Sequence, residues 1–257
     1  VNGHRLKQAA RDLLKPPVVE GVPDFRILRS VGSRKYPAKG YATYAVETEP
    51  GVHALVTRLH DDQLTSRPPK GAKRAVLYVS HRSADSELRH ESLVQDLLAA
   101  EPDAAFYAMD VRGIGESQPD ICGKDQFLRP YGSDYFLTAH GNMLGRPYLG
   151  QKVLDVLRVI TWLKDQGHEE IHLAGRGWGA IAASFAALLS DDVKQVTLKN
   201  ALISYGTIAE TEDYQWSYAQ LLPDVLKHFD LPDVYRALER KDLKQIEPWG
   251  AEDGMKE

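Results

Sequence analysis

Residues 170–189 read Glu170-Ile-His-Leu-Ala-Gly-Arg-Gly-Trp-Gly-Ala-Ile-Ala-Ala-Ser-Phe-Ala-Ala-Leu-Leu189. A short apolar run leads into Gly175-Arg176-Gly177-Trp178-Gly179, where every second residue is glycine, and a segment of small apolar residues follows. This pattern predicts a strand, a sharp turn and a helix, because glycine allows the unusual backbone angles and the close approach that such a turn needs.

Three interpretations of the turn are open. In α/β hydrolases it reads Gly-x-Ser-x-Gly, with the serine as nucleophile, and here the serine position holds Gly177. The favoured interpretation is therefore a hydrolase elbow without its serine, whether by evolution or by engineering. A dinucleotide-binding loop is the second, since Gly175-x-Gly177-x-x-Ala180 matches the relaxed fingerprint, although the next strand ends in Lys199-Asn200 where an acidic residue is expected. The third is a turn without chemistry.

Strand-like and helix-like segments alternate through most of the chain. Strands are expected at 41–46, 52–59, 75–79, 104–109, 171–174, 193–198 and 243–247, and helices at 4–14, 87–100, 147–166, 180–189 and 221–238, the last broken at Pro232. The prediction is an α/β fold with a mostly parallel sheet, helices on both faces and an N-terminal antiparallel hairpin. We expect one domain over 1–257, with a helical lead-in at 1–24 and a long loop at 111–146 bordering a pocket.

The composition excludes several classes of function. A net charge of −4 gives no basic surface for nucleic acid, and the longest apolar runs are too short to cross a membrane. The single cysteine, Cys122, excludes an internal disulfide. His168 and His172 do not share a helical face, and no cluster has metal-ligand spacing, so neither a metal nor a cofactor is expected.

A second motif supports the hydrolase interpretation. Asp110-Val-Arg-Gly-Ile-Gly-Glu-Ser117 follows the strand at 104–109, and the segments Tyr131–Tyr135 and Gly145–Gly150 lie farther along. Over residues 70–205 the chain resembles the bacterial acetyl-xylan-esterase-like branch of the α/β hydrolases. The resemblance implies that Asp110 and Arg112 order a loop beside the active site. It also implies an acyl ester or decorated polysaccharide as ligand, a periplasmic or secreted location, and additional domains or subunits.

The catalytic triad of this fold follows the chain order serine, acid, histidine. The segment at 243–247 corresponds to the acid-bearing strand, which makes Asp253 the candidate acid. His228 is the one histidine after the elbow and is a weak candidate base, because it precedes that strand. The last strand and its histidine are apparently absent, and a longer parent chain would explain this. We therefore expect a weakly active or inactive domain, or one that only binds a ligand or supports a partner.

The remaining candidates surround the predicted pocket. The backbone N–H of Trp178 follows the nucleophile position and is the expected oxyanion donor. His81 and Arg82 follow the strand at 75–79, where α/β hydrolases place their oxyanion loop, and Arg176 lies in the elbow. Four aromatic residues around the long loop could stack on a sugar, although packing of the loop is the favoured alternative: Tyr131, Tyr135, Phe136 and Tyr148. Ser80 and Ser204 are possible alternative nucleophiles, but neither lies on an elbow.

Overall fold

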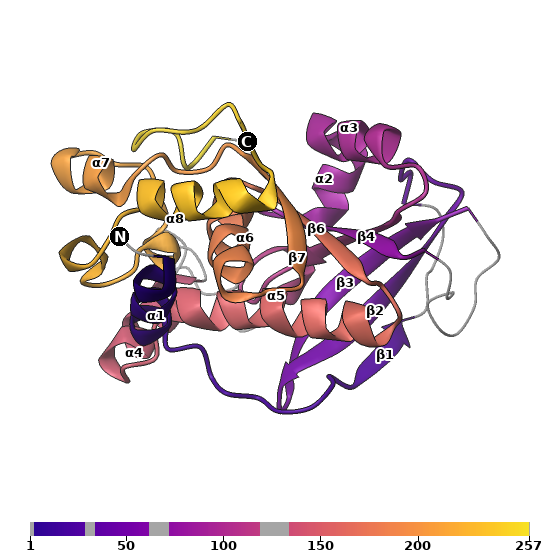
Figure 1. The fold of residues 1–257 in the computed structure, drawn as a ribbon, viewed down its shortest axis with the longest axis horizontal. Coiled ribbons are helices and arrows are strands. Elements are labelled where there is room, and N and C mark those ends of the chain that lie inside the picture. Colours follow the sequence, from indigo (N-terminus) through magenta and orange to yellow (C-terminus); the bar gives the residue numbers. More distant parts are fainter. Residues whose placement is uncertain (1–2, 29–33, 62–71, 119–133, 257) are drawn as a thin grey trace, which may run out of the picture.

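The computed structural model describes residues 3–28, 34–61, 72–118 and 134–256. Eight strands form one sheet in the order β1-β2-β3-β5-β4-β6-β7-β8 (Figure 1). The strands are β1 (Phe25–Leu28), β2 (Gly40–Glu49), β3 (Val52–His60), β4 (Arg74–Val79), β5 (Ala105–Asp110), β6 (Glu170–Arg176), β7 (Val193–Lys199) and β8 (Leu243–Ile246).

The sheet changes from antiparallel to parallel along its width. β1, β2, β3 and β5 pair antiparallel in turn, and β5, β4, β6, β7 and β8 are parallel neighbours. The predicted hairpin and the mostly parallel sheet are therefore confirmed. β1 was not predicted, because a strand of four residues is too short to give a periodic signal.

Helices cover both faces of the sheet. They are α1 (Gly3–Leu14), α2 (Ala84–His90), α3 (Ser92–Ala100), α4 (Asp134–Met143), α5 (Tyr148–Asp165), α6 (Gly177–Leu189), α7 (Tyr205–Glu210) and α8 (Leu231–Leu238). Figure 1 shows α1, α5, α6 and α8 gathered on one side of the sheet, and α2 and α3 on the other.

Alternate residues of the central strands supply the two cores. In β4, Leu77 and Val79 belong to the larger core, which includes apolar side chains of α1, α5, α6 and α8. Val76 and Tyr78 point to the opposite face and pack with apolar residues of α2 and α3. Because side chains alternate along a strand, this arrangement follows from burial of the sheet on both faces.

Several predicted elements differ from the structure. The helix expected at 87–100 is two helices, because Glu91 leaves the helical conformation and its side chain caps the N-terminus of α3. The loop expected at 111–146 contains α4 in its described part. Pro232 does not break a helix but lies in the first turn of α8, where the missing N–H costs nothing. α7 was not predicted.

Candidate functional site

Gly177 begins α6 directly after β6, in the position of a nucleophile elbow. Its φ is +50°, a conformation that L side chains rarely adopt. A Cβ added at Gly179 would lie 2.3 Å from the carbonyl oxygen of Ser80, so the helix can approach the sheet only with glycine there. The strand, sharp turn and helix predicted for this stretch are confirmed.

The imidazole of His81 occupies the space into which a side chain at position 177 would extend. A Cβ built on Gly177 would lie 2.3 Å from His81 Nδ1. The ring is 1% exposed and packs edge-on against Trp178 and Trp249, with centroid distances of 5.1 and 5.4 Å. Adding a serine therefore requires the imidazole or the turn to move.

Both ring nitrogens of His81 have hydrogen-bond partners. Nδ1 accepts from the backbone N–H of Trp178 at 3.0 Å, and Nε2 lies 3.1 Å from the carbonyl oxygen of Lys256. Since a carbonyl only accepts, Nε2 carries the proton and the ring is neutral. Burial, together with the charges of Arg176 and Arg82, lowers the pKa of His81 to about 3.

A buried carboxylate holds the loop that follows β4. Glu87 of α2 accepts hydrogen bonds from the backbone N–H groups of His81, Arg82 and Ser83, at 3.0, 2.9 and 3.3 Å. The hydroxyl of Tyr78 donates to the same carboxylate at 2.5 Å. Three successive N–H groups around a carboxylate form an anion-binding nest. Here that nest is filled by the protein's own side chain.

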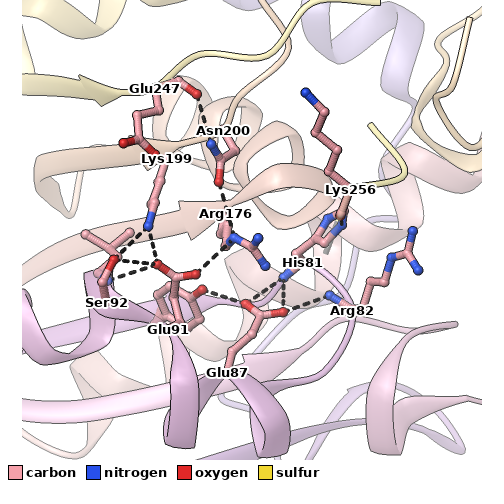
Figure 2. Close-up of polar contacts among 12 residues, drawn as sticks. His81, Arg82, Glu87, Glu91, Ser92, Arg176, Lys199, Asn200, Glu247 and Lys256 are labelled. Atoms are coloured by element: carbon pink, nitrogen blue, oxygen red, sulfur yellow. Dashed lines mark hydrogen bonds and ion pairs between the residues drawn. The ribbon is translucent and has the colours of Figure 1, made fainter. Parts of the chain in front are cut away.

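A second charged group joins the elbow to β7. Glu91 pairs with Arg176 at 3.1 Å and with Lys199 at 2.5 Å, and Arg176 Nε also donates to Asn200 (Figure 2). Burial opposes ionisation of Glu91, but the hydrogen bonds from the Leu93 N–H and Lys199 outweigh it and lower its pKa. The carboxylate is therefore ionised and neutralised locally.

Residues 249–256, near the end of the chain, pack against the elbow. Trp178 Nε1 donates to Gly254 O at 2.9 Å, and Arg82 Nη2 donates to Met255 O at 2.8 Å. Asp253, the candidate acid, accepts from the Gly250 N–H at 2.8 Å and pairs with Lys256 at 2.5 Å. The Lys256 hydrogen bond lowers the pKa of Asp253. Among the described residues, Asp253 is therefore held by Lys256 and the Gly250 N–H rather than by a histidine.

The other predicted residues lie apart from this group. His228 is exposed and lines a separate cavity of about 360 Å³ with side chains of α1, so the structure does not bring it to the elbow. Tyr135 lies on α4, is 38% exposed, and packs against Tyr218 at a centroid distance of 5.6 Å. Tyr131 and Cys122 lie outside the described residues.

The two alternative nucleophiles are both engaged elsewhere. Ser80 is fully buried and donates to Asp110 at 2.6 Å. Ser204 caps α7 and donates to Asp230. Their hydroxyls are hydrogen-bonded to carboxylates, but neither pair includes the histidine and oxyanion donors of a serine hydrolase.

The loop 110–117 is ordered by Asp110 and Arg112, as the resemblance implies. Asp110 accepts from Ser80 Oγ and from the N–H groups of Ala84 and Glu116 at 2.7 and 2.9 Å. Arg112 binds the buried Asp155 through Nε and Nη2, at 2.9 and 2.5 Å. Burial raises the pKa of Asp110 to about 6.

His168 and His172 are both buried and hydrogen-bonded to neighbouring strands and loops. His168 bonds Tyr107 Oη and the Ala72 carbonyl, and His172 bonds Glu101 and Thr197. Within the described ranges, no three His, Cys, Asp or Glu side chains lie together in a way that could hold a metal ion. Among the described helices, none has the length and apolar character needed to cross a membrane.

Comparison with solved structures identifies the architecture. An acetyl xylan esterase candidate from Bacteroides fragilis matches 96% of this chain and 67% of its own, with a TM-score of 0.73 and 18% identity. The chain has the α/β-hydrolase fold. Acetyl xylan esterase from a Paenibacillus species matches 94% of the chain and 74% of its own, with a TM-score of 0.53 and 19% identity.

A third solved structure extends the same similarity over nearly the whole chain. Acetyl xylan esterase 1 from a Thermoanaerobacterium species covers 99% of this chain and 90% of its own, with a TM-score of 0.53 and 13% identity. No protein-family model matches the chain, and no curated protein matches it either. The acetyl-xylan-esterase-like resemblance predicted from the motifs is therefore confirmed at the level of structure.

Proposed function

We propose that this chain is a hydrolase-fold domain that binds a small acyl or carbohydrate ligand and does not hydrolyse esters at its elbow. The observation that carries the proposal is the position of His81. Its ring fills the space of the missing nucleophile side chain beside Gly177 and accepts the Trp178 N–H. Serine hydrolases need a nucleophile and free donors at this place.

The donors that would stabilise an oxyanion are already occupied. The Trp178 N–H is bonded to His81 Nδ1, and the N–H groups of His81, Arg82 and Ser83 are bonded to Glu87. Charge developing on an ester oxygen would have to displace one of these acceptors. Removal of even one oxyanion donor from a working site lowers kcat by about 10²–10³.

Among the residues that the structure describes, His81 is the histidine at the elbow, and it is not suited to act as the base of a water-mediated reaction. A general base works best when its pKa lies near the working pH. The pKa of His81 is lowered to about 3, mainly by burial, and both of its nitrogens are hydrogen-bonded. The ligand class is inferred from the three structural neighbours, of which two are described as acetyl xylan esterases and one as a candidate acetyl xylan esterase.

Hydrolysis of p-nitrophenyl acetate and of acetylated xylan tests this proposal. The purified chain should release product no faster than the same chain after heat denaturation. A His81→Asn variant, which keeps an acceptor for the Trp178 N–H but removes the imidazole, is the matched control. Saturable turnover that is lost on denaturation and in His81→Asn would show that the elbow is catalytic and would overturn the proposal.

A further inference from the structure

A polar cavity of about 470 Å³ lies beside the elbow, between the end of β4, α2 and Arg176. All of its lining side chains are polar or charged, and they come from segments 81–91 and 176. The cavity includes Arg82 and Arg176, which Figure 2 shows on either side of His81. An all-polar lining is unusual for a pocket that binds an apolar acyl chain.

The acceptors in the cavity wall are already satisfied. Glu87 receives three backbone N–H groups and the Tyr78 hydroxyl, and Glu91 receives Lys199, Arg176 Nε and the Leu93 N–H. Lys199, which is not part of the lining, brings a positive charge to Glu91. With Arg82, Arg176 and Lys199 against two carboxylates, these groups carry an excess of one positive charge.

The donors, in contrast, are not all used. Arg176 binds Glu91 and Asn200 through Nε, and none of the contacts recorded among the described residues involves its two terminal nitrogens. Arg82 donates through Nη2 to Met255, while its Nε is buried without a hydrogen-bond partner. Both guanidiniums are positioned by rings, Arg176 over Trp249 and Arg82 over Trp178, at 5.7 and 5.2 Å.

The cavity favours one kind of ligand, because it offers unused donors, satisfied acceptors and a local excess of positive charge. It must be rich in acceptors and negatively charged. A carboxylate matches the planar donor edge of a guanidinium and forms charge-assisted hydrogen bonds with it. His81 already experiences the field of both arginines, since their charges lower its pKa further after burial.

We propose that this cavity binds a ligand through a carboxylate group held by Arg176 and Arg82. The inference rests on the proposed function, because it takes the elbow as a binding site and specifies the ligand class. The carboxylate could belong to a sugar acid or to a short free acid. Both present the same chemistry to the two arginines, and the experiment separates them.

Isothermal titration calorimetry of the full chain at low ionic strength tests the proposal with four probes: glucuronate, glucose, acetate and inorganic phosphate. Glucuronate should bind and glucose, which lacks only the carboxylate, should not. Binding of acetate as tightly as glucuronate would support a free acid as the source. Equal binding of glucose, binding of phosphate alone, or no binding of either carboxylate would each overturn the proposal.

Three variants locate the site. Arg82→Gln and Arg176→Lys should each weaken glucuronate or acetate binding at least tenfold, and Arg176→Lys keeps a cation opposite Glu91 so that the fold is retained. Arg236→Gln, at an exposed arginine on α8, should leave binding unchanged. Unchanged affinity in both cavity variants would contradict the assignment. Ester hydrolysis is measured in parallel. Turnover there would contradict the proposed function, whatever the titrations show.

Discussion

Two hydrolase-like motifs of this molecule, the loop 110–117 and the elbow 175–179, differ in the interactions that hold them. In the loop, Asp110 and Arg112 make dense hydrogen bonds that order the backbone. In the elbow, Gly177 has a φ of +50°, and the imidazole of His81 occupies the space into which a side chain at position 177 would extend. The comparison shows that the two motifs are ordered in different ways: the loop by buried charged side chains, and the elbow by glycine backbone geometry and the His81 imidazole.

The largest expected effect lies in the loop, where a buried ion pair holds the structure. Asp155→Asn leaves Arg112 buried without its main counter-charge, and the two side chains are only 1% and 9% exposed. The free energy of unfolding should fall by about 3–5 kcal/mol, measured by urea denaturation.

The matched control for that change is Asp224→Asn. Asp224 pairs with Lys227 at the surface, with both side chains more than half exposed. Stability should change little or not at all, because exposed ion pairs contribute little. Equal losses in the two variants would show that the loop is not held by the buried pair.

The pH dependence of stability should have opposite signs in the two regions. Asp110 has a pKa raised to about 6 from 3.8, so its contribution is present at low pH and is lost as pH rises through 6. His81 has a pKa lowered to about 3 from 6.5, so its contribution is present above 6.5 and is lost as pH falls toward 3. Between pH 7 and pH 4, acid therefore stabilises the loop and destabilises the elbow.

Substitutions should separate these two contributions. His81→Asn should reduce the loss of unfolding free energy between pH 7 and pH 4 by about 2–3 kcal/mol, since only the unfolded histidine gains a proton there. Asp110→Asn should increase the same loss by about 2 kcal/mol. Denaturant unfolding at the two pH values measures both, and changes of the same sign would contradict the comparison.

A smaller effect is expected from placing a serine at position 177. Gly177→Ser should destabilise the chain by about 1–3 kcal/mol, because the turn is strained for any Cβ and His81 Nδ1 lies 2.3 Å from its place. The same substitution in a His81→Ala background should cost about 1 kcal/mol less. Independent, additive effects, or strong esterase activity in Gly177→Ser alone, would show that His81 does not block the position.

The smallest effect is expected away from both motifs. Tyr135→Ala removes an exposed ring whose described contacts include Phe136 and Tyr218 on the surface. Thermal or denaturant unfolding should reveal a loss of about 0.5–1.5 kcal/mol, the usual worth of an aromatic pair. A loss as large as that of Asp155→Asn would mean that α4 contributes to the fold as strongly as the loop does.

Much of the fold follows from local sequence patterns. The apolar runs at 75–79, 104–109 and 171–174 each predict a buried strand, and Gly175–Gly179 predicts the elbow without any knowledge of the rest. The roles of Asp110 and Arg112 were also predictable, because a recognisable motif carries both. The break at Glu91 was not, since a capping glutamate inside a helical pattern looks like an ordinary surface residue.

The chemistry of the elbow could not be predicted in the same way. His81 and Trp178 are 97 residues apart, and no periodic pattern indicates that the imidazole meets the turn. Glu87 gives a similarly weak signal, because a glutamate in the first turns of a helix usually faces solvent, whereas this one is buried against the loop. Contacts between the ends of different strands form only when the whole sheet has assembled, so a local sequence pattern cannot predict them.

Nitrogen-15 NMR of the His81 imidazole across pH tests most directly whether this side chain closes the elbow. The His81→Asn spectrum would assign its resonances. The hydrogen bonds to Trp178 and Lys256 predict a neutral ring that carries its proton on Nε2 and none on Nδ1. Because the pKa is lowered to about 3, the ring should take up no second proton above about pH 4. Titration near pH 6.5, or a proton on Nδ1, would contradict the account.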